Sequence, residues 1–250
     1  MQPLAPALVW RKGPLRRADQ KGMPMFRLPL ALFLSLVSGT ALADTRFTLD
    51  GSLLIYNTAY PVDATLIDPD SGMSPADTVG DIAYEDIDAL RSILARNDGR
   101  VQTMRLTSDG GYIEAAYEMA AIIKDYGLNT EVQGECASAC AILFSAGESR
   151  VMNRGGRIGL HPSSWGVEAI RNYYEGTRAD SGWKDEFAFA EWVYEEGQRD
   201  ANKLITHFLS HGVSADFAVK VVSIGMNGMW YPTRAEMEAA NLITAPAAAD

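Results

Sequence analysis

The chain has 250 residues, 47% of them hydrophobic, and a formal net charge of −10 at pH 7. This length and apolar content indicate one globular domain with a full core and exclude a disordered or collagen-like chain. The acidic balance disfavours contact with phosphate backbones and anionic lipid, so we expect no nucleic-acid partner.

The N-terminal segment has the pattern of a secretory signal peptide. Arg27 precedes an apolar run over residues 28–42, and the small-x-small triplet at residues 41–43 is typical of a signal-peptidase site. The run is shorter than the roughly 20 apolar residues of a comfortable membrane span. We therefore expect a periplasmic or secreted protein with no stable membrane span after cleavage; a retained anchor is the alternative.

Cleavage after Ala43 sets the expected domain boundary. Residues 1–43 form the predicted signal peptide, for which Met25 is a more ordinary start, and residues 44–250 form the mature domain. Residues 1–43 hold six of the 22 basic residues and one of the 32 acidic ones, so the mature chain would have a formal charge of −15.

The predicted elements alternate between strands and helices, an order that implies a parallel sheet with right-handed crossovers. Residues 57–78, rich in Pro, Asp, Ser and Gly, indicate a surface loop that is either a lid or an insertion. In chain order we expect a strand at 46–56, a helix at 84–96, a strand at 101–106, a helix that ends at Gly127, a strand at 129–133, a helix from 141, strands at 150–153 and 157–160, a helix at 184–209 and a last helix that begins at a Thr233 capping box.

Two turns of small residues follow predicted strands. One contains Gly110 and Gly111, and the other surrounds Ser138. Ligands of parallel α/β sheets usually bind beyond the carboxyl ends of the strands, where helix N-termini present free N–H groups. We therefore expect the functional site at these two turns.

An ordered set of motifs resembles the pattern of the ClpP proteases, and the periplasmic ClpP/crotonase-like proteins resemble it more closely. The resemblance covers about residues 80–245 and implies a single-domain α/β fold, a ClpP/crotonase-like spiral of parallel strands and helices in ββα repeats. The motifs are Leu106-Thr107-Ser108-Asp109-Gly110-Gly111, Gly134-x-Cys136-Ala137-Ser138-Ala139-Cys140, Gly147 and Gly159-Leu160-His161.

This resemblance implies a serine hydrolase, a serine-type endopeptidase, that acts through an acyl-enzyme. Ser138 would be the nucleophile at a helix start and His161 its general base. Backbone N–H groups of Gly111 and Ala139 would form the oxyanion hole, with Gly110 in the substrate-binding turn. A simple N-cap serine and an ordinary glycine turn are the structural alternatives.

The third member of the triad is missing from its expected place. The family's carboxylate should precede the last helix by a few residues, yet residues 223–227 contain none. Asn227 can orient His161 as asparagine does in papain-like enzymes, and Asp216 can do so if the alignment slips. A Ser-His dyad and an inactive site also stay open.

Cys136 and Cys140 flank the candidate nucleophile. Their C-x3-C spacing fits neither a zinc knuckle nor a thioredoxin-type C-x-x-C motif, and an oxidising compartment allows them to pair. A disulfide would brace the turn, and two buried free thiols are the alternative. His207 and His211 lack a third ligand, so we expect no metal, and the chemistry requires no organic cofactor.

Aromatic residues crowd the segment after His161, where ClpP proteins place a handle used in ring assembly. Such residues form a partner interface or a substrate groove, and a homo-oligomer is one expectation. For Phe187, Trp192 and Tyr194 we favour core packing of the long helix. The aromatic residues are Trp165, Tyr173, Tyr174, Trp183, Phe187, Phe189, Trp192 and Tyr194.

Together these patterns predict an exported ClpP-like serine hydrolase that acts on peptides or unfolded protein. A non-catalytic ClpP-fold binding or scaffold protein is the alternative from another functional class, because fold alone does not guarantee activity. A Ser/Lys mechanism and a crotonase-type acyl-CoA enzyme are less favoured: the lysines lie on predicted helices without a path to Ser138, and export separates the protein from cytoplasmic CoA.

Overall fold

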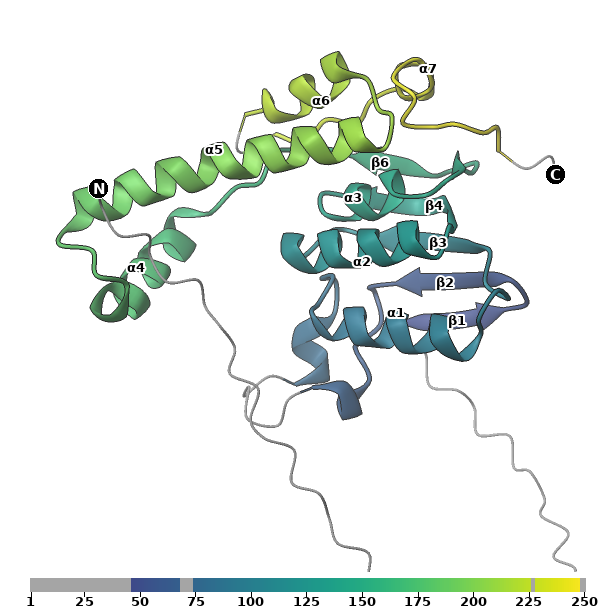
Figure 1. The fold of residues 1–250 in the computed structure, drawn as a ribbon, viewed down its shortest axis with the longest axis horizontal. Coiled ribbons are helices and arrows are strands. Elements are labelled where there is room, and N and C mark those ends of the chain that lie inside the picture. The colour runs from purple at the N-terminus through teal and green to yellow at the C-terminus, as the bar shows by residue number, and fades with distance from the viewer. Residues whose placement is uncertain (1–45, 68–73, 226–227, 248–250) are drawn as a thin grey trace, which may run out of the picture.

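The computed structural model describes residues 46–67, 74–225 and 228–247 (Figure 1). The predicted signal peptide, with Met25 and the cleavage site after Ala43, lies outside these residues, and so does Asn227. The strands are β1 Phe47–Asp50, β2 Leu53–Asn57, β3 Thr103–Ser108, β4 Asn129–Ala137, β5 Arg150–Met152 and β6 Arg157–Gly159. The helices are α1 Glu85–Arg96, α2 Ile113–Asp125, α3 Cys140–Ser145, α4 Val167–Ser181, α5 Glu186–Ser210, α6 Ala215–Val222 and α7 Arg234–Ala239.

The sheet confirms the predicted α/β class with parallel strands. Its order is β1-β2-β3-β4-β5, with β6 paired to β4 outside this path. Every pairing from β2 onward is parallel, and β1 pairs with β2 in the antiparallel direction. The carboxyl ends of β3, β4 and β6 therefore lie at one edge of the sheet.

The single strand predicted over residues 46–56 is wrong. A turn at Gly51 divides it into the β1–β2 hairpin, in which Phe47 pairs with Tyr56. Gly51 has a φ of +59°, a conformation that glycine adopts without the steric cost of a Cβ atom. The Asp-Gly pair was the signal for this hairpin, and the continuous apolar pattern on both sides obscured it.

A bulge in β4 directs the strand toward the site. Leu106 of β3 lies opposite Val132, but Ser108 lies opposite Cys136, so β4 uses four residues where β3 uses two. Gly134 within the bulge has a φ of +89°. The first half of β4 then pairs with β5 and the second half with β6, and this change of neighbour brings the end of β6 beside the end of β4.

One face of the sheet carries the helices. Met104 and Leu106 of β3 are buried under α1, α2 and α3, while Arg105 on the opposite face forms an ion pair with Glu131 of β4 at 2.5 Å. All six residues of α3 are buried, so this short helix lies within the core. The helix that follows Ser138 is therefore a fixed part of the molecule.

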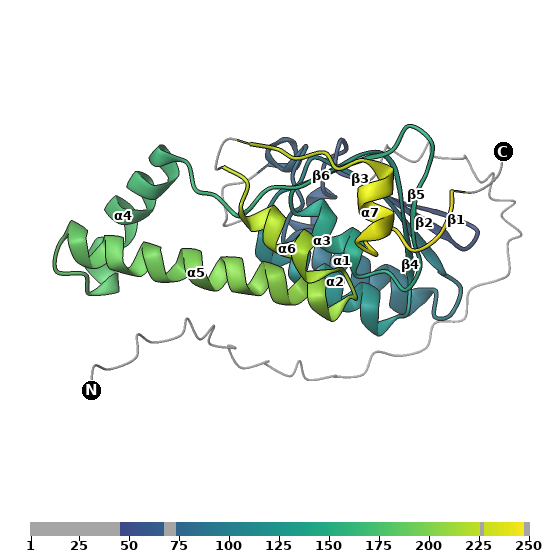
Figure 2. The ribbon, with the colours of Figure 1, turned by 90° about the horizontal axis from the view of Figure 1, so that it is seen from above.

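Helices α4 and α5 form an arm that extends away from the sheet in both views (Figures 1 and 2). Helix α5 matches the predicted long helix, whereas α4 and α6 were not predicted. Helix α4 has no buried side chain, although Val167, Ile170, Tyr173 and Tyr174 recur at helical spacing, and this signal was missed. No helix in the described ranges is both long enough and apolar enough to cross a membrane.

Aromatic side chains join the two helices of the arm. Core packing was wrong for Phe187 and Tyr194, which are 82% and 70% exposed, because this part of α5 extends beyond the body (Figure 2). The cluster between the helices consists of Trp165, Tyr173, Tyr174, Trp183, Phe189 and Trp192.

A buried ion pair fixes the loop before α1. The guanidinium of Arg46 donates to Asp86 at 2.7 Å, and both side chains are at most 2% exposed. Asp86 also accepts hydrogen bonds from the Tyr56 hydroxyl at 2.6 Å and the Ala83 N–H at 2.8 Å. Arg46 donates further to the carbonyl of Asp81 at 2.7 Å. These bonds satisfy both buried charges and hold the backbone that precedes α1.

We expect Arg46→Met to destabilise the protein by about 3–5 kcal/mol, because it leaves the Asp86 carboxylate buried without its cation. Urea unfolding measures this loss. Arg96→Met removes an exposed arginine and serves as the control, with a change of at most about 0.5 kcal/mol. A loss below 1 kcal/mol for Arg46→Met would show that the pair contributes little.

Candidate functional site

Ser138 lies at a sharp turn between β4 and α3. Its N–H donates to the Gly159 carbonyl at 2.9 Å, and its own carbonyl accepts from the Ala141 N–H at 3.0 Å. Ala139 is the N-cap of α3 and Ser138 precedes it, so Ser138 is not a simple N-cap serine. The first bond ties the turn to the end of β6, and the second ties it to α3.

The backbone of Ser138 has a φ of +56°, in the left-handed region. Only two residues other than glycine in the described part of the chain have a positive φ, and the second is Asn241. Such a conformation costs a serine roughly 1–2 kcal/mol and persists only where the surroundings enforce it. Strained residues of this kind cluster at active sites, so the backbone itself identifies Ser138 as a functional candidate.

His161 contacts Ser138 directly. Its Nε2 atom lies 2.7 Å from the Ser138 Oγ, a distance within hydrogen-bond range. His161 follows β6, and the residue before it, Leu160, exchanges two backbone hydrogen bonds of 2.8 Å with Trp230. The strand pairing on one side and this bridge on the other fix the position of the imidazole.

Gly110 and Gly111 form the second turn, which packs against the first. The Gly110 carbonyl accepts from the Ile82 N–H at 2.6 Å, and the Tyr112 N–H donates to the Ile82 carbonyl at 2.9 Å. A Cβ atom on Gly111 would lie 2.1 Å from the Ile82 nitrogen, and one on Gly110 would lie 2.7 Å from the Ser138 Cβ. Glycine is therefore required at both positions.

Two backbone N–H groups are free to bind an oxyanion. In the described residues, neither the Gly111 N–H nor the Ala139 N–H donates to a backbone carbonyl in the turns and loops. Both residues line the same cavity as Ser138. This arrangement matches what an oxyanion hole requires, namely preorganised donors near the nucleophile.

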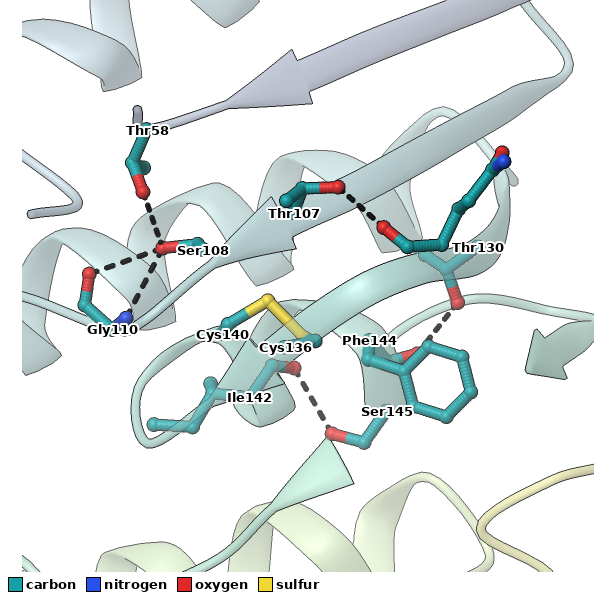
Figure 3. Close-up of a disulfide and its surroundings, with 11 residues drawn as sticks. Thr58, Thr107, Ser108, Gly110, Thr130, Cys136, Cys140, Ile142, Phe144 and Ser145 are labelled. Atoms are coloured by element: carbon teal, nitrogen blue, oxygen red, sulfur yellow. Dashed lines mark hydrogen bonds between the residues drawn. A yellow bond between two sulfur atoms is a disulfide. The ribbon is translucent and has the colours of Figure 1, made fainter. Parts of the chain in front are cut away.

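The hydroxyl of Ser108 supports the glycine turn (Figure 3). It receives a hydrogen bond from the Thr58 hydroxyl at 3.0 Å and one from the Gly110 N–H at 3.1 Å, and it donates to the Gly110 carbonyl at 3.2 Å. Ser108 lay within the motif that indicated the site, but its supporting role was missed. Thr58 belongs to a distant segment, and nothing in the sequence connects the two residues.

A cavity of about 560 Å³ lies beside Ser138 and His161. Trp165 and Tyr173 of the arm, together with Tyr84 and Tyr112 next to the glycine turn, contribute to its lining. Its wall is largely apolar, a composition typical of small-molecule and peptide sites. The aliphatic and phenyl side chains of this wall include Ile113, Ile142, Leu160, Leu204, Phe208 and Val221.

The orienting partner of His161 is not found among the described residues. Among these residues, the His161 side chain makes one hydrogen bond, and its partner is Ser138. Asp216 lies exposed in the first turn of α6 and makes no hydrogen bond to His161. A nearby carboxylate that was not predicted belongs to Asp200, which accepts from the Ser163 hydroxyl at 3.1 Å. Ser163 lines the cavity, so this bond ties the loop after His161 to α5.

Cys136 and Cys140 are joined by a disulfide (Figure 3). Cys136 lies near the end of β4, and Cys140 is the first residue of α3. The bond therefore spans the turn that contains Ser138.

His207 connects the arm to α3. Its Nε2 lies 2.9 Å from the Ser145 hydroxyl and 3.1 Å from the Ile142 carbonyl. Burial, together with the neighbouring His211, lowers the pKa of His207 from 6.5 to about 4, so the ring is neutral at pH 7. In the described residues no three side chains of the metal-ligating types lie together.

No protein-family model matches the chain, and no curated protein matches it in sequence. Among solved structures, a mutant form of ClpP1 from Listeria monocytogenes is similar to it, with a TM-score of 0.49 and 16% sequence identity over 66% of this chain and 85% of that chain. The function is therefore inferred from the geometry of the site.

Stability should fall as the pH is lowered from 6.5 toward 4, because unfolded His207 binds a proton in this range and folded His207 does not. The lowered pKa corresponds to a loss of roughly 3 kcal/mol at the acidic end. His207→Gln keeps a donor for the Ile142 carbonyl without titrating. Urea unfolding at several pH values should show a flatter profile for this variant, and parallel profiles would contradict the assignment.

Gly110→Ala should reduce the reactivity of Ser138 by at least about 100-fold, since small displacements of a reacting group have effects of this size. The added Cβ would press on the Ser138 Cβ, and the φ of +124° disfavours alanine. The measurement is the rate of fluorophosphonate labelling. Gly197→Ala in α5, where a Cβ meets open space, is the control and should leave the rate unchanged.

Proposed function

We propose that the protein is a serine hydrolase of the endopeptidase type that uses Ser138 as nucleophile and His161 as general base. The observation that carries this proposal is the 2.7 Å contact between the Ser138 Oγ and the His161 Nε2, at a serine with a left-handed backbone that faces a cavity. A core serine with a structural role needs neither the strained backbone nor the imidazole.

The acylation step follows from this geometry. The Ser138 Oγ attacks the carbonyl carbon of the substrate while its proton passes to the His161 Nε2. The negative charge that develops on the carbonyl oxygen is stabilised by the N–H groups of Gly111 and Ala139. His161 then donates the proton to the leaving group, and an acyl-enzyme on Ser138 results. A water molecule activated by His161 hydrolyses this ester and regenerates the site.

Peptide or unfolded protein is the substrate that this site fits best. The cavity is large enough for an apolar side chain together with neighbouring backbone, and its wall is mostly hydrophobic. The ordered motifs that resemble the ClpP proteases point to the same substrate class. The reaction uses side chains and backbone donors alone, and it needs no metal or organic cofactor.

We place the protein in the periplasm or outside the cell, on the signal-peptide pattern that ends at Ala43. In that compartment a substrate arrives without an ATP-driven unfoldase, which favours flexible peptides and unfolded segments. A homo-oligomer is part of the proposal, because the exposed aromatic residues Phe187 and Tyr194 offer apolar surface for a second copy.

A non-catalytic binding protein is the second candidate. It is favoured by one observation, that no described carboxylate or amide orients His161. Such a protein would hold a peptide in the same cavity without cleaving it. The two functions differ in the reactivity of Ser138, which can be measured without knowledge of the substrate.

Labelling with a fluorophosphonate probe, followed by intact mass, tests the proposal. We expect one adduct on the wild type and none on Ser138→Ala, because the adduct forms on the activated Oγ. His161→Ala should label at least about 100-fold more slowly, since the proton acceptor is lost.

Ser92→Ala, on the exposed face of α1, is the matched control and should label like the wild type. A folded wild type that forms no adduct would refute the hydrolase and favour the binding protein.

A further inference from the structure

The disulfide encloses the candidate nucleophile in a small covalent ring. Cys136 and Cys140 are four positions apart, and Ser138 lies midway between them. The bond links Cys136, near the end of β4, to Cys140, the first residue of α3. The two ends of the catalytic turn are thus held at a Cα–Cα distance of 5.2 Å by a covalent bond.

Both cysteines are completely buried. Cys136 lies opposite Ser108 in the pairing of β4 with β3, and Ser108 holds Gly110 through its hydroxyl. Cys140 belongs to α3, whose six residues are all buried. The ring is therefore anchored in the core on one side and borders the glycine turn on the other (Figure 3).

The backbone of Ser138 requires this restraint. A φ of +56° is unfavourable for serine, and in the described residues the backbone of Ser138 itself makes two hydrogen bonds, to Gly159 and from Ala141. Gly110 leaves room for the Ser138 turn because it has no Cβ atom, but this close contact does not hold the turn in its conformation. Without the disulfide, the chain between β4 and α3 can relax to a right-handed conformation, which would move the Oγ away from His161.

We propose that the Cys136–Cys140 disulfide is the positioning device that makes Ser138 reactive, so that the site works only in its oxidised form. The inference rests on the proposed hydrolase function and adds its regulation. An exported chain would then be inactive while its thiols are reduced and become active after oxidation. Neither sulfur takes part in the chemistry, and both cysteines act through the position of Ser138.

The redox step is an ordinary thiol–disulfide exchange. A dithiol reductant gives two electrons and two protons to the Sγ–Sγ bond, which breaks into two thiols, and the reductant becomes a cyclic disulfide. Oxidation reverses this, with a small-molecule or protein disulfide as the electron acceptor. Because both sulfur atoms are buried, exchange in the folded protein requires local opening and should be slow.

A role in general stability predicts a different result. In the chain-entropy account, the stabilisation from a disulfide increases with the length of the loop that it closes, and this loop is very short, so the bond contributes little to global stability. Loss of the bond should therefore affect the turn much more than the fold as a whole. The relevant comparison is a variant with an equal or larger loss of thermal stability away from the site.

The test compares wild type, the double variant Cys136→Ala/Cys140→Ala and Leu94→Ala, a core substitution at the end of α1. Fluorophosphonate labelling rates are measured on folded protein, and hydrogen exchange is followed at the amides of residues 139–145. We expect the double variant to label at least tenfold more slowly and to exchange faster in this segment. Leu94→Ala should label at the wild-type rate. Wild type reduced with dithiothreitol, with two thiols verified by mass, should behave like the double variant and recover after oxidation.

Three outcomes would overturn the inference. They are a folded double variant or reduced wild type that labels at the oxidised wild-type rate, equal slowing in Leu94→Ala, and unchanged exchange in residues 139–145. If oxidised wild type does not label at all, the hydrolase function fails. Hydrogen exchange then still decides whether the disulfide holds the turn, since faster exchange confined to this segment supports positioning.

Discussion

The site depends on the close approach of two backbone turns. Gly110 packs against Ser138 at a distance that leaves no room for a Cβ atom, and Gly111 packs in the same way against Ile82. This contact places Gly111 of the glycine turn at the same cavity as Ser138 and Ala139 of the other turn. The bulge in β4 and its change of partner from β5 to β6 both serve this contact, because they direct the end of β4 toward the glycine turn and His161.

Different interactions support each turn. The ion pair between Arg46 and Asp86 holds the backbone around Ile82, on which the glycine turn rests. The Ser108 hydroxyl holds Gly110 from the other side. The Ser138 turn has two backbone hydrogen bonds and a disulfide. Because most groups that face a substrate carbonyl are backbone atoms, substitutions in the supporting residues would change the site without touching the substrate.

The sequence was sufficient to predict features that depend on local pattern. The helix over residues 84–96, the strand before the glycine turn and the helix after it, and the capping box at Thr233 all occur as expected. The motifs also identified Ser138 and His161, which the structure brings together. These two residues were assigned from the resemblance of the ordered motifs to the ClpP pattern, whereas local turn chemistry indicated only the two small-residue turns.

Other features depend on tertiary contacts and could not be predicted from local pattern. The bulge at Gly134 is defined only by its pairing with β3, and Thr58 reaches Ser108 from 50 residues away. The exposure of Phe187 depends on how far α5 extends beyond the body. The left-handed backbone of Ser138 is a further example, since serine gives no sequence signal for it.

The distribution of charge in the site explains why position matters so much. In the described residues no carboxylate hydrogen-bonds to His161, so the proposed acylation would form an imidazolium without a carboxylate partner. Changing the buried aspartate of a serine-protease triad to asparagine lowers turnover by about 10⁴-fold. A Ser-His pair without this group must obtain its rate from the oxyanion donors and from a fixed distance between Oγ and Nε2. Both depend on backbone conformation, so under the proposed hydrolase function the covalent and hydrogen-bonded restraints on the two turns would set the rate.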